Sequence, residues 1–297
     1  MNWEGFANNR LTVPMGRIAG IPIRLHLIFL VVLALQLLGS LQYGLPQVLL
    51  WSILLGPVLL LTVLVHELGH CLAARSVGGQ VDGVLLWPLG GLAFIGHTAG
   101  PKADMWVAVA GPLTHVPMVG IWLLLLLPAF HASTGSWAIN LDMPWPSSGH
   151  LWHAVCVGAI IINLSLLAFN LLVPAYPLDG GRLLVDALLA AGVAPRLAAG
   201  ITVGVAVPLG LLVLVYGILV FQMVTIMVAV FILFATFQLF QALRTDSLAR
   251  HPLFAVACSD AAGGGAAAGP GGPYFKFESP SFGAAGAAGG GRSSAAV

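Results

Sequence analysis

Charged residues are scarce in this chain of 297 residues, at 7% of the total against roughly 25% in an ordinary soluble domain. The 11 lysines and arginines form no cluster, which argues against a nucleic-acid partner. The three cysteines, Cys71, Cys156 and Cys258, are an odd number, so we expect no disulfide framework. Hydrophobic residues make up 59% of the chain and its mean hydropathy is +1.00, which indicates a polytopic membrane protein.

The long apolar stretches predict an all-α membrane protein with about six transmembrane helices, because a helix needs about 20 residues to cross a bilayer. The predicted spans are residues 24–40, 47–76, 104–130, 153–173, 199–219 and 223–243. Residues 1–23 are predicted to be a cytoplasmic leader, and residues 24–245 form the membrane domain. Residues 246–297 are rich in Gly and Ala, which predicts a disordered tail.

The basic residues predict the orientation of these spans. With six spans every Lys and Arg falls on one side, because the loops 41–46, 131–152 and 220–222 contain none. Basic flanks are retained on the cytoplasmic side of a membrane. We therefore expect an integral membrane protein in the lipid bilayer with both termini cytoplasmic, or stromal if the membrane belongs to an organelle.

Within the second predicted span, the sequence HELGH places three ionisable side chains in an apolar stretch. His66 and His70 are four residues apart and share one face of a helix, with Glu67 beside that face. This spacing is typical of two zinc-binding imidazoles with a glutamate as general base. Such groups are costly in hydrocarbon without partners or a function, which favours a metal site over an accidental match.

A hydrolytic zinc site has three protein ligands and one open position, so a third ligand must come from elsewhere. Most other acidic residues lie in the termini, in the opposite loop or in the loop that follows the second span. Asp186 stands four residues after Arg182, a spacing that predicts an ordinary helical ion pair. Asp179 lies in VPAYPLDGG, whose prolines and glycines predict irregular backbone, tolerated at membrane depth only beside a site or within protein. Asp179 is therefore the best candidate for the third ligand.

The loop of residues 78–104 contains VDGVLLWPLGGLAFI, which predicts two short strands joined by a turn against the membrane. Such a β-hairpin-like loop could pair its free edge with an unwound substrate segment. A simple interfacial loop is an equally good interpretation of the same residues.

The segments VHELGHCLAAR, LLWPLGGLAF, AGPLTH and FNLLVPAYPLDGGR, in this order and after GRIAGIPIRLHLIF, resemble the site-2 protease family of intramembrane zinc metalloproteases, in its compact six-span form without a PDZ domain. The resemblance covers about residues 14–243. It implies one zinc ion bound by His66, His70 and Asp179, with Glu67 as the catalytic acid and base. It also implies a single-pass or hairpin membrane protein as substrate, cut within or near its span.

Three polar residues outside these motifs have alternative interpretations. Asn170 matches a family asparagine that binds substrate, although Val173 is one residue more than the common motif contains; a simple interhelical hydrogen bond is the alternative. Asn163, on the same helical face, is expected to make such a bond. His115 is expected to be a partnered buried histidine, with a supporting contact to the zinc ligands as the alternative.

Two other functions are compatible with the same ligands. A catalytically idle relative would bind membrane-protein clients without cutting them, but the intact Glu67 and Asp179 argue against it. A metal-ion transporter would need a route across the membrane and typically repeated halves, and the sequence has no internal repeat. The ligand types also permit iron or cobalt in place of zinc.

Overall fold

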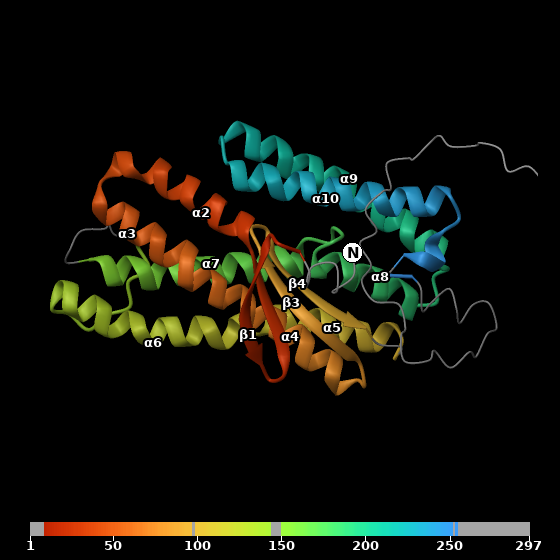
Figure 1. Cartoon of the computed structure of the whole chain (residues 1–297), viewed down its shortest axis with the longest axis horizontal. Helices are drawn as coiled ribbons and strands as arrows, with labels where there is room; N and C mark the ends of the chain where they lie inside the picture. Colours follow the sequence, from red (N-terminus) through yellow and green to blue (C-terminus); the bar gives the residue numbers. More distant parts are fainter. Residues whose placement is uncertain (1–8, 97–98, 144–149, 252, 255–297) are drawn as a thin grey trace, which may run out of the picture.

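The computed structural model describes residues 9–96, 99–143, 150–251 and 253–254, and the structural statements below concern these residues. Long helices dominate the chain, and a small sheet lies among them near the middle of the view (Figure 1). The helices are α2 (Leu27–Ser40), α3 (Leu45–Ile53), α4 (Leu59–Ser76), α5 (Pro101–Leu113), α6 (His115–Thr134), α7 (Leu151–Leu172), α8 (Asp179–Ala190), α9 (Pro195–Leu219) and α10 (Met223–Arg244). Short turns of helix precede α3, join α3 to α4 and follow α10: η1 (Leu41–Tyr43), η2 (Leu54–Val58) and η3 (Leu248–Arg250).

Five helical segments are long and apolar enough to cross a membrane. They match the second to sixth predicted spans and are Leu45–Ser76, Pro101–Thr134, Leu151–Leu172, Pro195–Leu219 and Met223–Arg244. The first predicted span differs, because residues 24–26 belong to a strand and the apolar helix Leu27–Tyr43 is shorter than the other five. Membrane helices of the predicted kind are therefore present, and five of the six have the expected length.

The sheet contains four strands, so the chain is not all-α as predicted. The strands are β1 (Thr12–Ile18), β2 (Ile21–His26), β3 (Gln80–Trp87) and β4 (Gly90–Gly96), in the order β1-β2-β3-β4. The hairpin predicted within residues 78–104 is confirmed as the antiparallel pair β3 and β4.

The hairpin β1–β2, which begins in the predicted leader and ends in the first predicted span, was not expected. Ala19 and Gly20 both have positive φ at its turn, the geometry of a tight hairpin. Ile21, Ile23 and Leu25 alternate with more exposed residues along β2 and are buried. β2 pairs in parallel with β3, with Ile23 opposite Val84. This long-range pairing makes the N-terminal segment part of the sheet.

The sheet packs on α4, and the buried residues between them form one hydrophobic cluster. Val63, Cys71, Ala73 and Ala74 of α4 contribute to this cluster with the inward side chains of β2 and β3. Because α4 carries the HELGH sequence, this packing determines which strands lie beside it.

Two residues of the predicted tail belong to a packed cluster. Leu248 and Phe254 are buried against Val185 of α8, Ala198 and Ala199 of α9, and Leu239 of α10. The remainder of the predicted disordered tail, from residue 255 onward, lies outside the described residues.

Candidate metal centre

The HELGH sequence lies in the third and fourth turns of α4, facing into the protein. His66, Glu67 and His70 are all buried, although their helix is one of the candidate membrane spans. The partners of these side chains come from α5, α6, α8 and β4, as the following contacts show. The ionisable groups are therefore enclosed by protein, where polar side chains in a membrane protein find hydrogen-bond partners.

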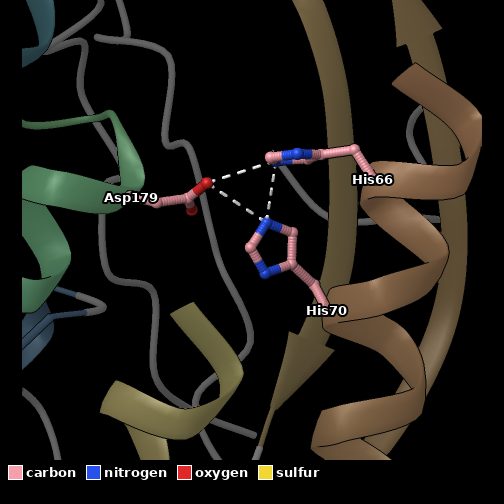
Figure 2. A group of neighbouring side chains, drawn as sticks. All are labelled: His66, His70 and Asp179. Atoms are coloured by element: carbon pink, nitrogen blue, oxygen red, sulfur yellow. Dashed lines mark hydrogen bonds and ion pairs between the residues drawn. The ribbon is translucent and has the colours of Figure 1, made fainter. Parts of the chain in front are cut away.

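His66, His70 and Asp179 converge on one point (Figure 2). The Nε2 atoms of the two histidines are 3.1 Å apart, and Oδ2 of Asp179 lies 3.2 Å from Nε2 of His66 and 3.3 Å from Nε2 of His70. Three ligands about 2.05 Å from a tetrahedral zinc ion lie about 3.3 Å from one another. The donor set and its spacing therefore fit a zinc ion with one position left open.

The orientation of His70 is set by a backbone carbonyl of α5. Nδ1 of His70 lies 2.7 Å from the carbonyl oxygen of Val107. Because a carbonyl oxygen only accepts, Nδ1 carries the hydrogen and Nε2 presents its lone pair to the cluster. This is the tautomer that a metal ligand requires, and a second hydrogen bond of this kind is usual for metal-binding histidines.

Asp179 is the first residue of α8, directly after the irregular segment that the prolines and glycines predict. The helix N-terminus favours a carboxylate at this position. The chain folds back so tightly that a Cβ atom at Gly181 would lie 2.3 Å from the backbone nitrogen of Tyr176. Burial alone would raise the pKa of Asp179, but the neighbouring His70 and His66 lower this pKa below its ordinary value, so the side chain is a carboxylate.

Glu67 lies between the histidines and strand β4. Its carboxylate accepts a hydrogen bond from the backbone N–H of Ala93. Gly91 is so close that a Cβ atom there would lie 2.2 Å from Cγ of Glu67. Since β4 pairs with β3 along one edge, an N–H that reaches Glu67 points from its other edge. The outer edge of β4 therefore faces Glu67.

A cavity of about 540 Å³ opens beside these side chains. His66, Glu67, His70 and Asp179 line it together with residues 89–94 of the hairpin. Much of the remaining wall is apolar and includes Trp87, Leu166, Phe169, Val228, Phe231 and Phe234. Trp87 and Phe231 are in edge-to-face contact with ring centroids 5.0 Å apart, which joins the sheet to α10. The cavity can take apolar side chains next to the predicted metal ligands.

Asn170 lines the same cavity from α7. Its Nδ2 atom donates to the carbonyl oxygen of Leu166 at 3.1 Å, one turn earlier. The helix ends at Leu172, and Val173 follows it with extended backbone. Asn170 is thus close to the site, and its substrate-binding role stays a prediction.

His115 and Asn163 form a buried hydrogen-bonded chain with His66. Nε2 of His115 lies 3.0 Å from Nδ1 of His66, and Nδ1 of His115 lies 3.0 Å from Oδ1 of Asn163. The expected interhelical bond of Asn163 is therefore present. His115 is both a buried histidine with a polar partner, Asn163, and a supporting contact to a predicted metal ligand, His66, so the structure supports both interpretations of this residue.

Arg182 pairs with a different carboxylate from the predicted Asp186. Arg182 of α8 donates a hydrogen bond to Asp104 of α5 at 2.7 Å, whereas Oδ2 of Asp186 has no hydrogen-bond partner among the described residues. Arg182 and Asp186 do lie one turn apart on the same helix, as predicted. However, α5 packs alongside α8 and supplies the Asp104 carboxylate that Arg182 contacts. The spacing of residues in the sequence did not predict this contact. The contact holds α8, the helix that carries Asp179, against α5.

Comparisons with known proteins find similar metalloproteases. The sequence profile of peptidase family M50 matches residues 55–135, which include HELGH. A zinc metalloprotease of Methanocaldococcus jannaschii is 27% identical over 245 residues, covering 81% of this chain and 64% of that protein. Rip3 of Mycobacterium tuberculosis is 36% identical over 183 residues, covering 59% of this chain and 43% of that protein. The chain thus spans less than two thirds of the length of both relatives.

A solved structure is also similar. The site-2 protease from Methanocaldococcus jannaschii matches with a TM-score of 0.50 and 26% identity, over 76% of this chain and 94% of that one. The family profile, the two relatives and this structural match converge on one group of proteins. The chain is therefore similar in sequence and fold to site-2 proteases and to zinc metalloproteases of this group.

Proposed function

We propose that this chain is an intramembrane zinc endopeptidase that hydrolyses peptide bonds within or near the transmembrane segment of a single-pass or hairpin membrane protein, as in regulated intramembrane proteolysis. The observation that carries the proposal is the convergence of three donor atoms, 3.1 to 3.3 Å apart, inside a candidate membrane domain. Buried ligands beside a substrate-sized apolar cavity are what such a reaction needs.

His66, His70 and Asp179 would hold the zinc ion through Nε2, Nε2 and Oδ2. When bound, zinc supplies Lewis-acid chemistry, lowering the pKa of a coordinated water and stabilising negative charge that develops on the scissile carbonyl oxygen. His70 is held for this role by Val107, and Asp179 by the N-terminus of α8.

Glu67 would act as general base and then as general acid. Its carboxylate accepts the proton of the attacking water and later returns it to the leaving amine. Gly91 allows strand β4 to lie against Glu67, and the N–H of Ala93 orients the carboxylate toward the cavity. The proton therefore moves through a group that is held in place before the substrate binds.

The substrate would bind as an extended segment along the outer edge of β4. A transmembrane helix must be unwound before its peptide bonds are accessible, and an unwound segment needs new backbone partners. The outer edge of β4 faces Glu67, so a strand added there lies next to the catalytic carboxylate. Asn170, which also lines the cavity, would contribute a polar contact.

We further propose six membrane crossings with both termini on the cytoplasmic or stromal side. The helix Leu27–Tyr43 has 17 residues and would span about 25 Å, close to the thickness of the hydrocarbon core. In Figure 1 the neighbouring ends of α2 and α3, of α6 and α7, and of α9 and α10 are the left ends of these helices. The loops between these paired ends contain no Lys or Arg.

The proposal is tested by replacing Glu67 with Gln and coexpressing each form with a panel of tagged single-pass membrane proteins. We expect fragments cut within the span from the wild type only, and about one zinc ion per chain in both purified proteins. The matched control is Asp142→Asn, the same chemical change at an exposed carboxylate in the loop before α7. This variant should cut like the wild type.

Each alternative gives a different result. Wild-type protein that binds zinc but cleaves no member of the panel would favour a client-binding relative without activity. Fragments from Glu67→Gln would disprove the role of Glu67. Absence of zinc from the wild type would disprove the metal centre itself.

A further inference from the structure

Among the described residues, His66 has no backbone carbonyl partner of the kind that orients His70. The atom beside its Nδ1 is Nε2 of His115, at 3.0 Å, and an imidazole nitrogen can either donate or accept. The tautomer of His66 therefore depends on which nitrogen of His115 carries hydrogen. The contacts of Asn163 provide the answer.

The chain of hydrogen bonds begins at a backbone carbonyl of α7. The carbonyl oxygen of Ala159 lies 2.9 Å from the side-chain amide of Asn163, and this oxygen only accepts. The NH₂ group of Asn163 must therefore face Ala159, and it also lies 3.5 Å from Oγ1 of Thr62. Its oxygen then faces His115, whichever way the amide is drawn.

The remaining two steps follow from the same rule. Oδ1 of Asn163 only accepts, so Nδ1 of His115, 3.0 Å away, carries the hydrogen. Since complete burial disfavours the charged imidazolium, Nε2 of His115 is left with a lone pair. Nδ1 of His66 must then donate to it, which leaves the lone pair of His66 on Nε2, toward His70 and Asp179.

We propose that His115 and Asn163 are positioning residues that select the metal-binding tautomer of His66 through a hydrogen-bonded relay anchored on the Ala159 carbonyl. The relay joins α4, α6 and α7. This inference depends on the proposed zinc site. Its members are all buried, so water does not compete for these hydrogen bonds.

The test compares His115→Leu with His115→Gln by measuring the zinc dissociation constant against a competing chelator. Leu offers no acceptor, so the N–H of His66 loses its partner and we expect zinc to bind about 10- to 100-fold more weakly. Gln can accept from His66 with Oε1 and donate to Asn163 with Nε2, so affinity should return to within a few-fold of the wild type. The control Thr202→Val removes a buried hydrogen bond in α9 and should leave affinity unchanged.

A second measurement reads the tautomer directly in zinc-loaded wild type. With histidine labelled by ¹⁵N, NMR should show Nδ1 of His115 protonated and Nε2 unprotonated. The opposite pattern would overturn the proposal, as would a His115→Leu variant that binds zinc like the wild type or a His115→Gln variant as weak as His115→Leu. Neither measurement needs a substrate, so a wild type that binds zinc but cleaves nothing would count against the protease function alone.

Discussion

At the scale of single residues, two glycines permit the contacts around the proposed zinc site. Gly91 of β4 lies against Glu67, and Gly111 of α5 lies against His70. A Cβ atom at either position would be 2.2 Å from the neighbouring side chain, closer than van der Waals contact allows. The two glycines contact different members of the site, so their replacement should have different consequences.

Gly91→Ala should impair catalysis while preserving the metal. The added methyl group displaces the carboxylate of Glu67, whereas none of the three metal ligands is its nearest neighbour. We expect cleavage of a substrate to fall by at least about 100-fold, since general acid–base catalysis contributes about 10²- to 10⁴-fold. Zinc content, measured on the purified protein, should stay near one ion per chain.

Gly111→Ala should instead weaken metal binding, because its methyl group would lie on Nε2 of His70. We expect the zinc dissociation constant to rise at least about 10-fold, and cleavage to fall with it. The matched control is Gly120→Ala in α6, where a Cβ atom meets nothing within 4 Å. Equal zinc affinity in Gly111→Ala and Gly120→Ala would contradict the proposed role of His70.

At the scale of elements, α8 connects the site to a buried group of charges. Asp186 is buried one turn beyond Arg182, next to the Asp104 carboxylate of α5. Burial, and then the charge of Asp104, raise the pKa of Asp186 to about 9, although Arg182 acts in the opposite direction. The folded protein therefore holds Asp186 in its neutral form at pH 7.

This pKa predicts how stability depends on pH. The folded-state pKa lies above the ordinary value of 3.8, so the folded protein binds the extra proton and its stability falls as pH rises from about 4 to about 9. The slope from this group approaches about 1.4 kcal/mol per pH unit. Asp186→Asn, which resembles the neutral acid, should melt at a less pH-dependent temperature than the wild type. Asp142→Asn should retain the wild-type dependence, and an identical dependence in all three proteins would contradict the prediction.

The segment after α10 also stabilises the region around Asp179. Phe254 is completely buried against α8, α9 and α10, and His251 packs on Tyr176 in the loop before Asp179 with ring centroids 5.5 Å apart. We expect Phe254→Ala to cost about 3 kcal/mol of unfolding free energy, measured by denaturation in detergent micelles, because it leaves a cavity in this cluster. Phe221→Ala, at a side chain that is 91% exposed, should change stability by less than about 0.5 kcal/mol.

At the scale of the whole molecule, the sheet and the membrane helices form the two walls of the site. Strand β4 of the sheet lies beside Glu67. Helices α5 and α6 supply hydrogen-bond partners of His70 and His66, and α7 supplies the partner of His115. With the proposed six crossings, these parts lie near the side that carries the basic residues. The reaction would therefore occur toward the cytoplasmic or stromal surface.

The orientation predicts which positions an impermeant reagent can reach. In a Cys258→Ser background, Ser136→Cys after α6 and Thr245→Cys after α10 should react with a membrane-impermeant maleimide from opposite sides of sealed vesicles. Both positions are exposed, and both substitutions are small. Labelling of the two from the same side would show that the number of crossings between them is wrong.

Several features follow from the sequence because they depend on local spacing. The interval of four residues places His66 and His70 on one helical face, and the prolines and glycines around Asp179 interrupt the helix where a ligand is needed. Hydrophobic length gives five of the spans, and the turn between β3 and β4 marks the hairpin. The alternation of Ile21, Ile23 and Leu25 is also local, but it crosses the boundary between the predicted leader and the first predicted span, and the strand was missed.

The tertiary structure decides the contacts that spacing leaves open. The pairing of β2 with β3, the partner of Arg182 and the relay from Asn163 to His66 each join segments that lie at least 48 residues apart along the chain. Neither periodicity nor motif spacing contains that information. Several polar residues in the sequence could chemically serve as the partner of a given side chain, and only the packing of the helices brings one of them within reach. The sequence by itself determined which side chains could bind a metal, and only packing decided which atoms orient them.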